Sequence, residues 1–201
     1  MLEEADYMLF EFGMRHLILL LFFAVLITES RNFEKKIWKK RTITWKFDDP
    51  FELLSQRQKN IVSELAENAF DEWKYALEGL LKIKKLEENS KIPADININF
   101  AKKNHSCIES FDGRGGVVAH STYPTNGILH LDADELWHTG DQTKGEVDLR
   151  YVLIHEIGHV LGLRHSRRKN SVMRRNYRKS TKSFKLSKYD VRAIRKLYTF
   201  N

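Results

Sequence analysis

The stretch HEIGHVLGLRHS, residues 155–166, combines three histidines, one glutamate and two glycines in a spacing that neither a buried nor a solvated helix requires. Residues four apart lie on the same face of a helix, so His155 and His159 can direct two imidazoles at one ion. Glu156 would then sit beside that ion without binding it. The spacing predicts two zinc ligands and a base on one helix.

A third imidazole six residues further on needs a change of direction. On a continuing helix His165 would face about 240° away from His159, at about 100° per residue. It can reach the same ion only if the chain turns sharply, and Gly162 permits that turn as a left-handed helix cap. A bare HExxH pattern also occurs by chance in helices with ordinary histidines. The added glycine and third histidine favour the metal site over that alternative.

Three histidines leave one position of a tetrahedral zinc ion open for water, which is the arrangement of a catalytic site. The metal makes that water acidic enough to attack near neutral pH. We expect Glu156 to take its proton and later to deliver it to the leaving amine.

The chain has 201 residues, of which 42% are hydrophobic and 30% charged, as in a soluble globular protein of about one domain. One segment differs: residues 17–27 are LILLLFFAVLI, too short to span a bilayer comfortably. We interpret residues 1–30 as a signal-like segment cleaved near Ser30, and therefore expect a secreted protein. Residues 1–13 contain no base, so they are interpreted as an over-extended start preceding Met14. The alternatives are a buried helix or an uncleaved anchor.

Charge is unevenly distributed. Residues 164–196 contain fourteen lysines and arginines and one acid, a local charge of +13, whereas residues 47–163 carry −8. Such a basic region attracts sulfated polysaccharide, anionic membrane or nucleic acid, and the alternative is a solvated face without function. A signal-like segment and an acidic body argue against nucleic acid. Cys107 is the single cysteine, so no disulfide can form within the chain, and a secreted domain must be held together by its core or by metal.

Apolar periodicity predicts an α/β (α+β) domain with a mixed, twisted sheet and helices packed on it. Ser55 opens a capping box with Gln58, ahead of an amphipathic helix of about six turns. Two further helices are predicted, and residues 101–116 form a loop. The predicted strands are residues 42–47, 80–86, 96–100, 117–121 and 128–131, and the later helices are residues 147–162 and 187–198.

The motif extends beyond its third histidine. Met173 follows His165 by eight residues. The stretch HEIGHVLGLRHS and this methionine together resemble the zinc-binding motif and Met-turn of the metzincins. Ser166, directly after the third histidine, resembles the matrixins, or matrix metalloproteinases. The resemblance covers residues 38–198. It implies a five-stranded mixed sheet with three helices, a catalytic domain at residues 31–201, and a Met173 that packs beneath the metal without binding it.

The stretch PADININFAKKNHSCIESFDGRGGVVAHS, residues 93–121, resembles the metal loop of that family. The resemblance implies a second, structural zinc bound by His105, His120 and His130. Cys107 stands where the family has an aspartate. A thiolate is a good zinc ligand, so the site is either His3Cys or a three-ligand site, with an inert buried cysteine as the alternative.

The resemblance also implies calcium. Oxygen ligands gathered by a glycine-rich loop suit that ion independently of the family. The implied calcium ligands are Asp112, Gly113, Gly115, Asp132 and Glu135, with Asp95 serving a second calcium.

Substrate contacts follow from the same resemblance. Tyr151, four residues before the first zinc histidine, would line the main specificity pocket and make it shallow, which favours leucine. Tyr177 would belong to the outer wall, where the family's proline is replaced by Arg175. The strand around Ala119 would pair with an extended peptide.

No cysteine-switch sequence of the PRCGxPD type and no hemopexin-like domain is found, so we expect a minimal, monomeric matrixin. The sequence predicts a secreted zinc endopeptidase acting on extracellular or matrix proteins. The alternative is a non-catalytic, metal-stabilised binding protein that docks polyanions through residues 164–196. Glu156 argues against this alternative, because an acid beside a metal is costly to keep unless it works.

Overall fold

The computed structural model divides the chain after Lys35, and all described residues belong to the second unit. The structure describes residues 36–87, 90–105, 110–140, 147–175 and 185–199. The signal-like segment, Cys107 and Tyr177 therefore lie outside the described residues. Within the described part, no helix is long and apolar enough to cross a membrane.

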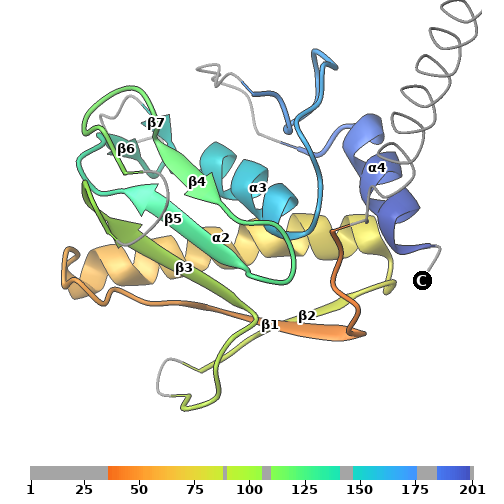
Figure 1. The fold of residues 1–201 in the computed structure, drawn as a ribbon, viewed down its shortest axis with the longest axis horizontal. Coiled ribbons are helices and arrows are strands. Elements are labelled where there is room, and N and C mark those ends of the chain that lie inside the picture. Colours follow the sequence, from red (N-terminus) through yellow and green to blue (C-terminus); the bar gives the residue numbers. More distant parts are fainter. Residues whose placement is uncertain (1–35, 88–89, 106–109, 141–146, 176–184, 200–201) are drawn as a thin grey trace, which may run out of the picture. The chain divides into compact units, whose positions relative to one another are not determined.

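The main sheet has five strands in the order β2-β1-β3-β5-β4 (Figure 1). Neighbouring strands are parallel except for the β4–β5 pair, which is antiparallel. The predicted mixed five-stranded sheet is thus confirmed, with β2 and β4 shorter than the sequence patterns indicated. The strands are β1 (Thr42–Phe47), β2 (Lys82–Lys85), β3 (Ile96–Ala101), β4 (Ala119–Ser121) and β5 (Ile128–Asp132).

Three helices occur among the described residues: α2 (Gln56–Leu77), α3 (Leu149–Val160) and α4 (Lys188–Tyr198). The predicted capping box is present at the start of α2, where Ser55 and Gln58 satisfy each other's backbone N–H groups. A small parallel pair, β6 (Trp137–His138) and β7 (Val147–Asp148), was not predicted because each strand is only two residues long.

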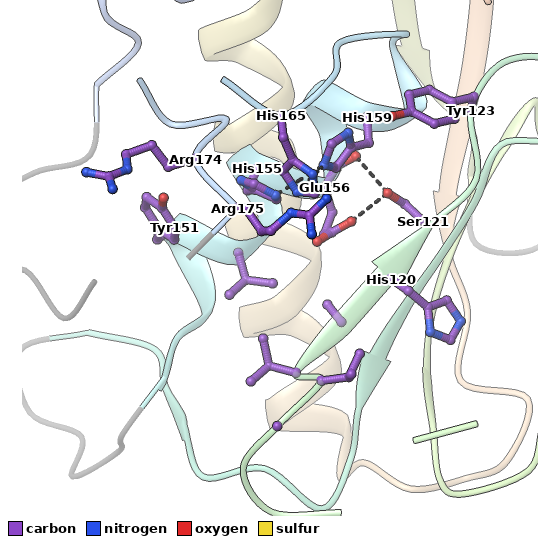
Figure 2. A pocket seen from close by; sticks show the side chains of 15 residues that line it. His120, Ser121, Tyr123, Tyr151, His155, Glu156, His159, His165, Arg174 and Arg175 are labelled. Atoms are coloured by element: carbon purple, nitrogen blue, oxygen red, sulfur yellow. Dashed lines mark hydrogen bonds between the residues drawn. The ribbon is translucent and has the colours of Figure 1, made fainter. Parts of the chain in front are cut away.

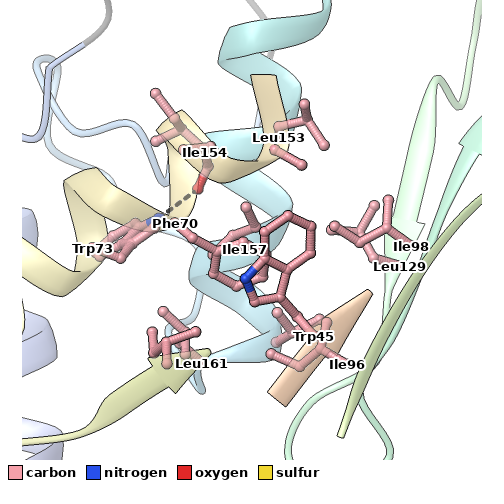
Figure 3. Packing of buried hydrophobic residues seen from close by; sticks show 14 of the residues in the cluster. Trp45, Phe70, Trp73, Ile96, Ile98, Leu129, Leu153, Ile154, Ile157 and Leu161 are labelled. Atoms are coloured by element: carbon pink, nitrogen blue, oxygen red, sulfur yellow. Dashed lines mark hydrogen bonds between the residues drawn. The ribbon is translucent and has the colours of Figure 1, made fainter. Parts of the chain in front are cut away.

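The core fixes α3 between its neighbours. This helix contacts α2 on one side and strands β4 and β5 on another, and its residues from Val152 to Val160 are buried all round. The indole of Trp73 on α2 donates a hydrogen bond of 3.0 Å to the carbonyl of Ile154 (Figure 3). Phe70 stacks on Trp45 of β1 at a centroid distance of 4.6 Å. A helix held in this way cannot rotate, so the directions of its side chains are fixed.

Candidate active site

Three imidazoles from α3 and the following turn converge. The Nε2 atom of His159 lies 3.2 Å from Nε2 of His155 and 3.3 Å from Nε2 of His165. Zinc–nitrogen bonds are about 2.0–2.1 Å long, so two ligands of a tetrahedral zinc ion are about 3.3–3.4 Å apart. The observed separations fit that geometry.

The other ring nitrogens show why a cation belongs there. His155 Nδ1 contacts the carbonyl of Val172 at 2.7 Å, and His159 Nδ1 contacts the carbonyl of Leu163 at 2.7 Å. A carbonyl only accepts, so both Nδ1 atoms carry the proton and both Nε2 atoms present lone pairs. Facing lone pairs repel unless a cation lies between them. The donor set therefore fits zinc.

The turn that returns His165 is a glycine cap. Gly162 has a φ of +104°, its N–H donates to the carbonyl of His159 at 2.8 Å, and the next N–H, of Leu163, donates to the carbonyl of Gly158 at 2.9 Å. These two bonds form a Schellman motif, so the predicted left-handed cap is present and the helix ends at Val160. A Cβ on Gly162 would lie 2.2 Å from the carbonyl oxygen of Lys36.

Met173 packs against the middle of α3. A Cβ on Gly158 would lie 2.3 Å from the Met173 sulfur, so the lack of a side chain at Gly158 leaves the space that the Met173 side chain fills. The Met173 carbonyl also accepts from the N–H of Ser166 at 2.7 Å. The segment around Met173 thus packs against the helix and is hydrogen-bonded to the residue after the third histidine.

Sequence reasoning missed the residue that holds this segment. The buried carboxylate of Asp190 accepts from the Ser171 hydroxyl at 2.5 Å and from the Val172 N–H at 3.2 Å. The carbonyl of Val172 is in turn the partner of His155. The available signal was the Ser187–Asp190 capping box at the start of α4, which indicates a helix start but not its contact with the site.

Glu156 points into the site from the same helix and is only 8% exposed. Its Oε2 accepts a hydrogen bond of 2.5 Å from the hydroxyl of Ser121 on β4 (Figure 2). Burial raises the pKa of Glu156 to about 7, although the Ser121 hydroxyl acts in the opposite direction. A carboxyl group whose pKa is near neutral suits a proton acceptor and donor at that pH. No sequence pattern indicated Ser121.

Burial also lowers the pKa of His159 to about 4, and the neighbouring histidines add to this effect. The pKa values of His155 and His165 are lowered as well, first by burial. Neutral imidazole is the form that binds a metal, so all three side chains are in the binding form at neutral pH.

A second histidine cluster is formed by His105, which follows β3, with His120 of β4 and His130 of β5. His120 Nε2 lies 3.2 Å from His105 Nε2 and 3.3 Å from His130 Nδ1. Burial lowers the pKa of His130 to about 4. The spacing again fits zinc, and these three residues are the ones that the resemblance implied.

The residues implied for calcium lie around one loop. Glu135 accepts from the Gly115 N–H at 2.7 Å, and Asp112 accepts from the Val117 N–H at 3.1 Å. The Oδ2 atom of Asp132 is buried without a hydrogen-bond partner, as expected for an oxygen that binds a cation. Gly113 has a φ of +87°. The loop fits a calcium ion at this position.

Asp95 has other partners. Its carboxylate pairs with the Lys40 ammonium and accepts from the Thr44 N–H at 3.0 Å. These bonds lower the pKa of Asp95 although burial alone would raise it. Asp95 stays a predicted ligand of a second calcium ion, and binding of that ion would compete with these contacts.

A cleft of about 710 Å³ lies over Glu156 and the α3 histidines. One side is the edge of β4, including Ala119, and α3 contributes Tyr151, whose hydroxyl donates to the carbonyl of Val172 at 3.2 Å. Arg174 and Arg175 line it after the Met173 segment (Figure 2). The cleft brings together the predicted peptide-pairing edge, the predicted pocket residue and the histidine cluster.

The site has the features of a metzincin metal site. Three imidazoles from a helix and the turn after it converge beside a buried carboxylate, and a methionine turn supports them.

Comparison with known proteins gives the family. The matrixin family model matches residues 37–199, so the chain belongs to the matrixin family, as the resemblance indicated. It is 44% identical over 120 residues to Metalloendoproteinase 1 of Glycine max, which covers 57% of this chain and 39% of that protein. Matrix metalloproteinase-25 of Mus musculus is 39% identical over 145 residues, or 70% of this chain and 23% of that protein. Matrix metalloproteinase-C of Caenorhabditis elegans is 37% identical over 175 residues, 80% of this chain and 28% of that protein. The chain thus spans well under half the length of these relatives.

Proposed function

We propose that this protein is a zinc-dependent endopeptidase that is secreted and hydrolyses peptide bonds of extracellular or matrix proteins. The observation that carries the proposal is the convergence of three Nε2 atoms beside a buried carboxylate. Zinc bound by His155, His159 and His165 would supply Lewis-acid chemistry, which makes water a nucleophile near neutral pH.

The chain's own residues supply the remaining steps. An extended peptide pairs with the β4 edge and places a side chain against Tyr151. Glu156 accepts a proton from the attacking water and then delivers it to the leaving amine. Ser121 holds one oxygen of Glu156, which leaves the other oxygen for proton transfer.

The remaining assignments are proposed with it. Residues 31–201 form the catalytic domain. A structural zinc lies at the second histidine cluster, and a calcium ion lies beside Asp132 at the end of β5. Cys107 is a candidate fourth ligand of the structural zinc. Tyr177 belongs to the outer wall of the cleft.

The deciding experiment compares the unmodified chain with Glu156→Ala on a quenched peptide with leucine after the scissile bond, with zinc measured in both. Both proteins should hold the same zinc, because Glu156 is not a ligand. Only the unmodified protein should cut the peptide. Equal turnover by the two proteins would rule out the proposed role of Glu156, and zinc without any turnover would favour the binding-protein alternative.

One observation favours an additional polyanion-binding role. Lys188, Arg192 and Lys196 are exposed at four-residue spacing and so share a face of α4. We propose that this face docks sulfated polysaccharide. Retention on heparin that is lost in salt, and that weakens in Arg192→Gln, would support the role; no retention would exclude it.

A further inference from the structure

Two arginines in the cleft of the proposed peptidase, Arg174 and Arg175, have no anionic partner in the part of the chain that the structure describes. No ion pair is formed by Arg174 or Arg175 within the described residues, whereas Arg150 pairs with Asp148 at 2.7 Å and Arg195 with Glu78 at 2.6 Å. Exposed arginines such as Arg57 on α2 also form no ion pair among the described residues; Arg174 and Arg175 differ from them because they line the cleft.

Arg174 is the stronger of the two candidates for a substrate contact. Its Nη1 atom is buried and has no hydrogen-bond partner. A buried guanidinium nitrogen without an acceptor destabilises the protein, because it has lost water and gained no bond. The Arg174 side chain lines the cleft, so its rotation toward a bound substrate would let a carboxylate supply the missing acceptor, and an arginine can bind a carboxylate through two nitrogens.

Arg175 adds charge closer to the metal site. It is exposed, and in Figure 2 it extends toward the histidine cluster. Among the described residues that line the cleft, Glu156 is the sole carboxylate, and it is buried against Ser121. The accessible charge of the cleft is thus positive.

From these contacts we propose that the protein prefers substrates with an acidic side chain directly after the scissile bond, bound by Arg174 with support from Arg175. The inference rests on the proposed function, which assigns that side chain to the region beside Tyr151. Tyr151 and Val152 line the same cleft and would pack against the methylene groups of a glutamate. The guanidinium groups would then receive its carboxylate.

The test uses four quenched peptides that differ only in the residue after the scissile bond: glutamate, glutamine, leucine or lysine. Glutamate and glutamine have the same shape, so the ratio of their kcat/KM values isolates the charge. The unmodified protein should prefer glutamate by about ten-fold, the size expected for a hydrogen bond between charged groups. Lysine should be the poorest of the four.

Variants then locate the source of the preference. Arg174→Gln should bring the glutamate-to-glutamine ratio close to one, and Arg174→Glu should shift the preference toward lysine. Arg175→Gln, at an exposed position, should lower the ratio by a smaller factor and gives a result even if changes at Arg174 impair folding. Arg57→Gln is the matched control, because it removes the same charge from an exposed site on α2 and should keep the ratio.

Each outcome has a definite meaning. A ratio near one in the unmodified protein, or an equal fall in the ratio for Arg174→Gln and Arg57→Gln, would overturn the inference. Cleavage of the leucine peptide without a preference for glutamate would reject it while leaving the proposed peptidase intact. Failure to cut any of the four peptides would contradict the proposed function itself.

Discussion

Replacing Gly162 with alanine should damage the site formed by the three histidines of α3 and its turn. Two separate effects act at this position. The φ of +104° is one that L-residues rarely adopt, and the new Cβ would lie 2.2 Å from the carbonyl oxygen of Lys36.

The magnitudes can be set from these two effects. The positive φ costs alanine about 1–2 kcal/mol. Relief of the contact requires the turn and the Lys36 segment to separate by about 1 Å, and overpacking of this kind costs about 1–3 kcal/mol. We expect the free energy of unfolding to fall by about 2–5 kcal/mol in total. His165 follows the turn, so zinc affinity should fall as well, because ligand distances tolerate only about 0.2 Å.

Gly79→Ala is the matched control. Gly79 has a φ of +85°, but nothing lies within 4 Å of the added Cβ, so only the backbone effect of about 1 kcal/mol applies. Denaturant unfolding at a fixed zinc excess gives both stabilities, and competition with a chelator gives zinc affinity. If Gly162→Ala loses no more stability than Gly79→Ala and retains full zinc affinity, the packing of Lys36 against the turn does not set the position of His165.

Three further changes test other parts of the structure. Asp95→Asn should lower the free energy of unfolding by about 1 kcal/mol at pH 7. Because the folded-state pKa of Asp95 is lowered, this difference should be present above the unfolded pKa near 4 and should vanish as the pH falls through the folded-state pKa. Denaturant titrations at several pH values would measure it. Asp190→Asn replaces one acceptor oxygen by an NH2 group that faces the Ser171 hydroxyl or the Val172 N–H, so the free energy of unfolding should fall by about 1–3 kcal/mol. Zinc binding should weaken too, because the Val172 carbonyl contacts His155. Unchanged zinc affinity in chelator competition would show that Asp190 does not support the site. Asp132→Asn should abolish the rise in melting temperature that calcium gives the unmodified protein, and an equal rise in both would remove Asp132 from the ligand set.

Local sequence was sufficient for several parts of the molecule. A helix places residues four apart on one face, so the spacing of His155 and His159 predicted their convergence before any fold was known. The position of Gly162 predicted the turn, because a left-handed cap depends only on a few neighbouring backbone groups. The capping box at Ser55 and the strand around Ile98 are local in the same way, and the structure has both.

Other parts required the tertiary structure. Ser121 reaches Glu156 across 35 positions of the chain, and Asp190 reaches Val172 across 18. No periodicity encodes such contacts, because they depend on how the sheet, α3 and α4 pack together. Asp95, a predicted calcium ligand, also pairs with Lys40 and Thr44, which the fold brings to it from β1 and the segment before it.

The sequence by itself determined which atoms can bind a metal, because histidine spacing on a helix and a glycine turn are short-range geometry. Only the tertiary structure decided what surrounds those atoms: which carboxylate is buried, which hydroxyl contacts it, and which arginines remain without a partner. Burial and pairing set pKa values and recognition, and both arise from segments that are distant in the chain and adjacent only after folding.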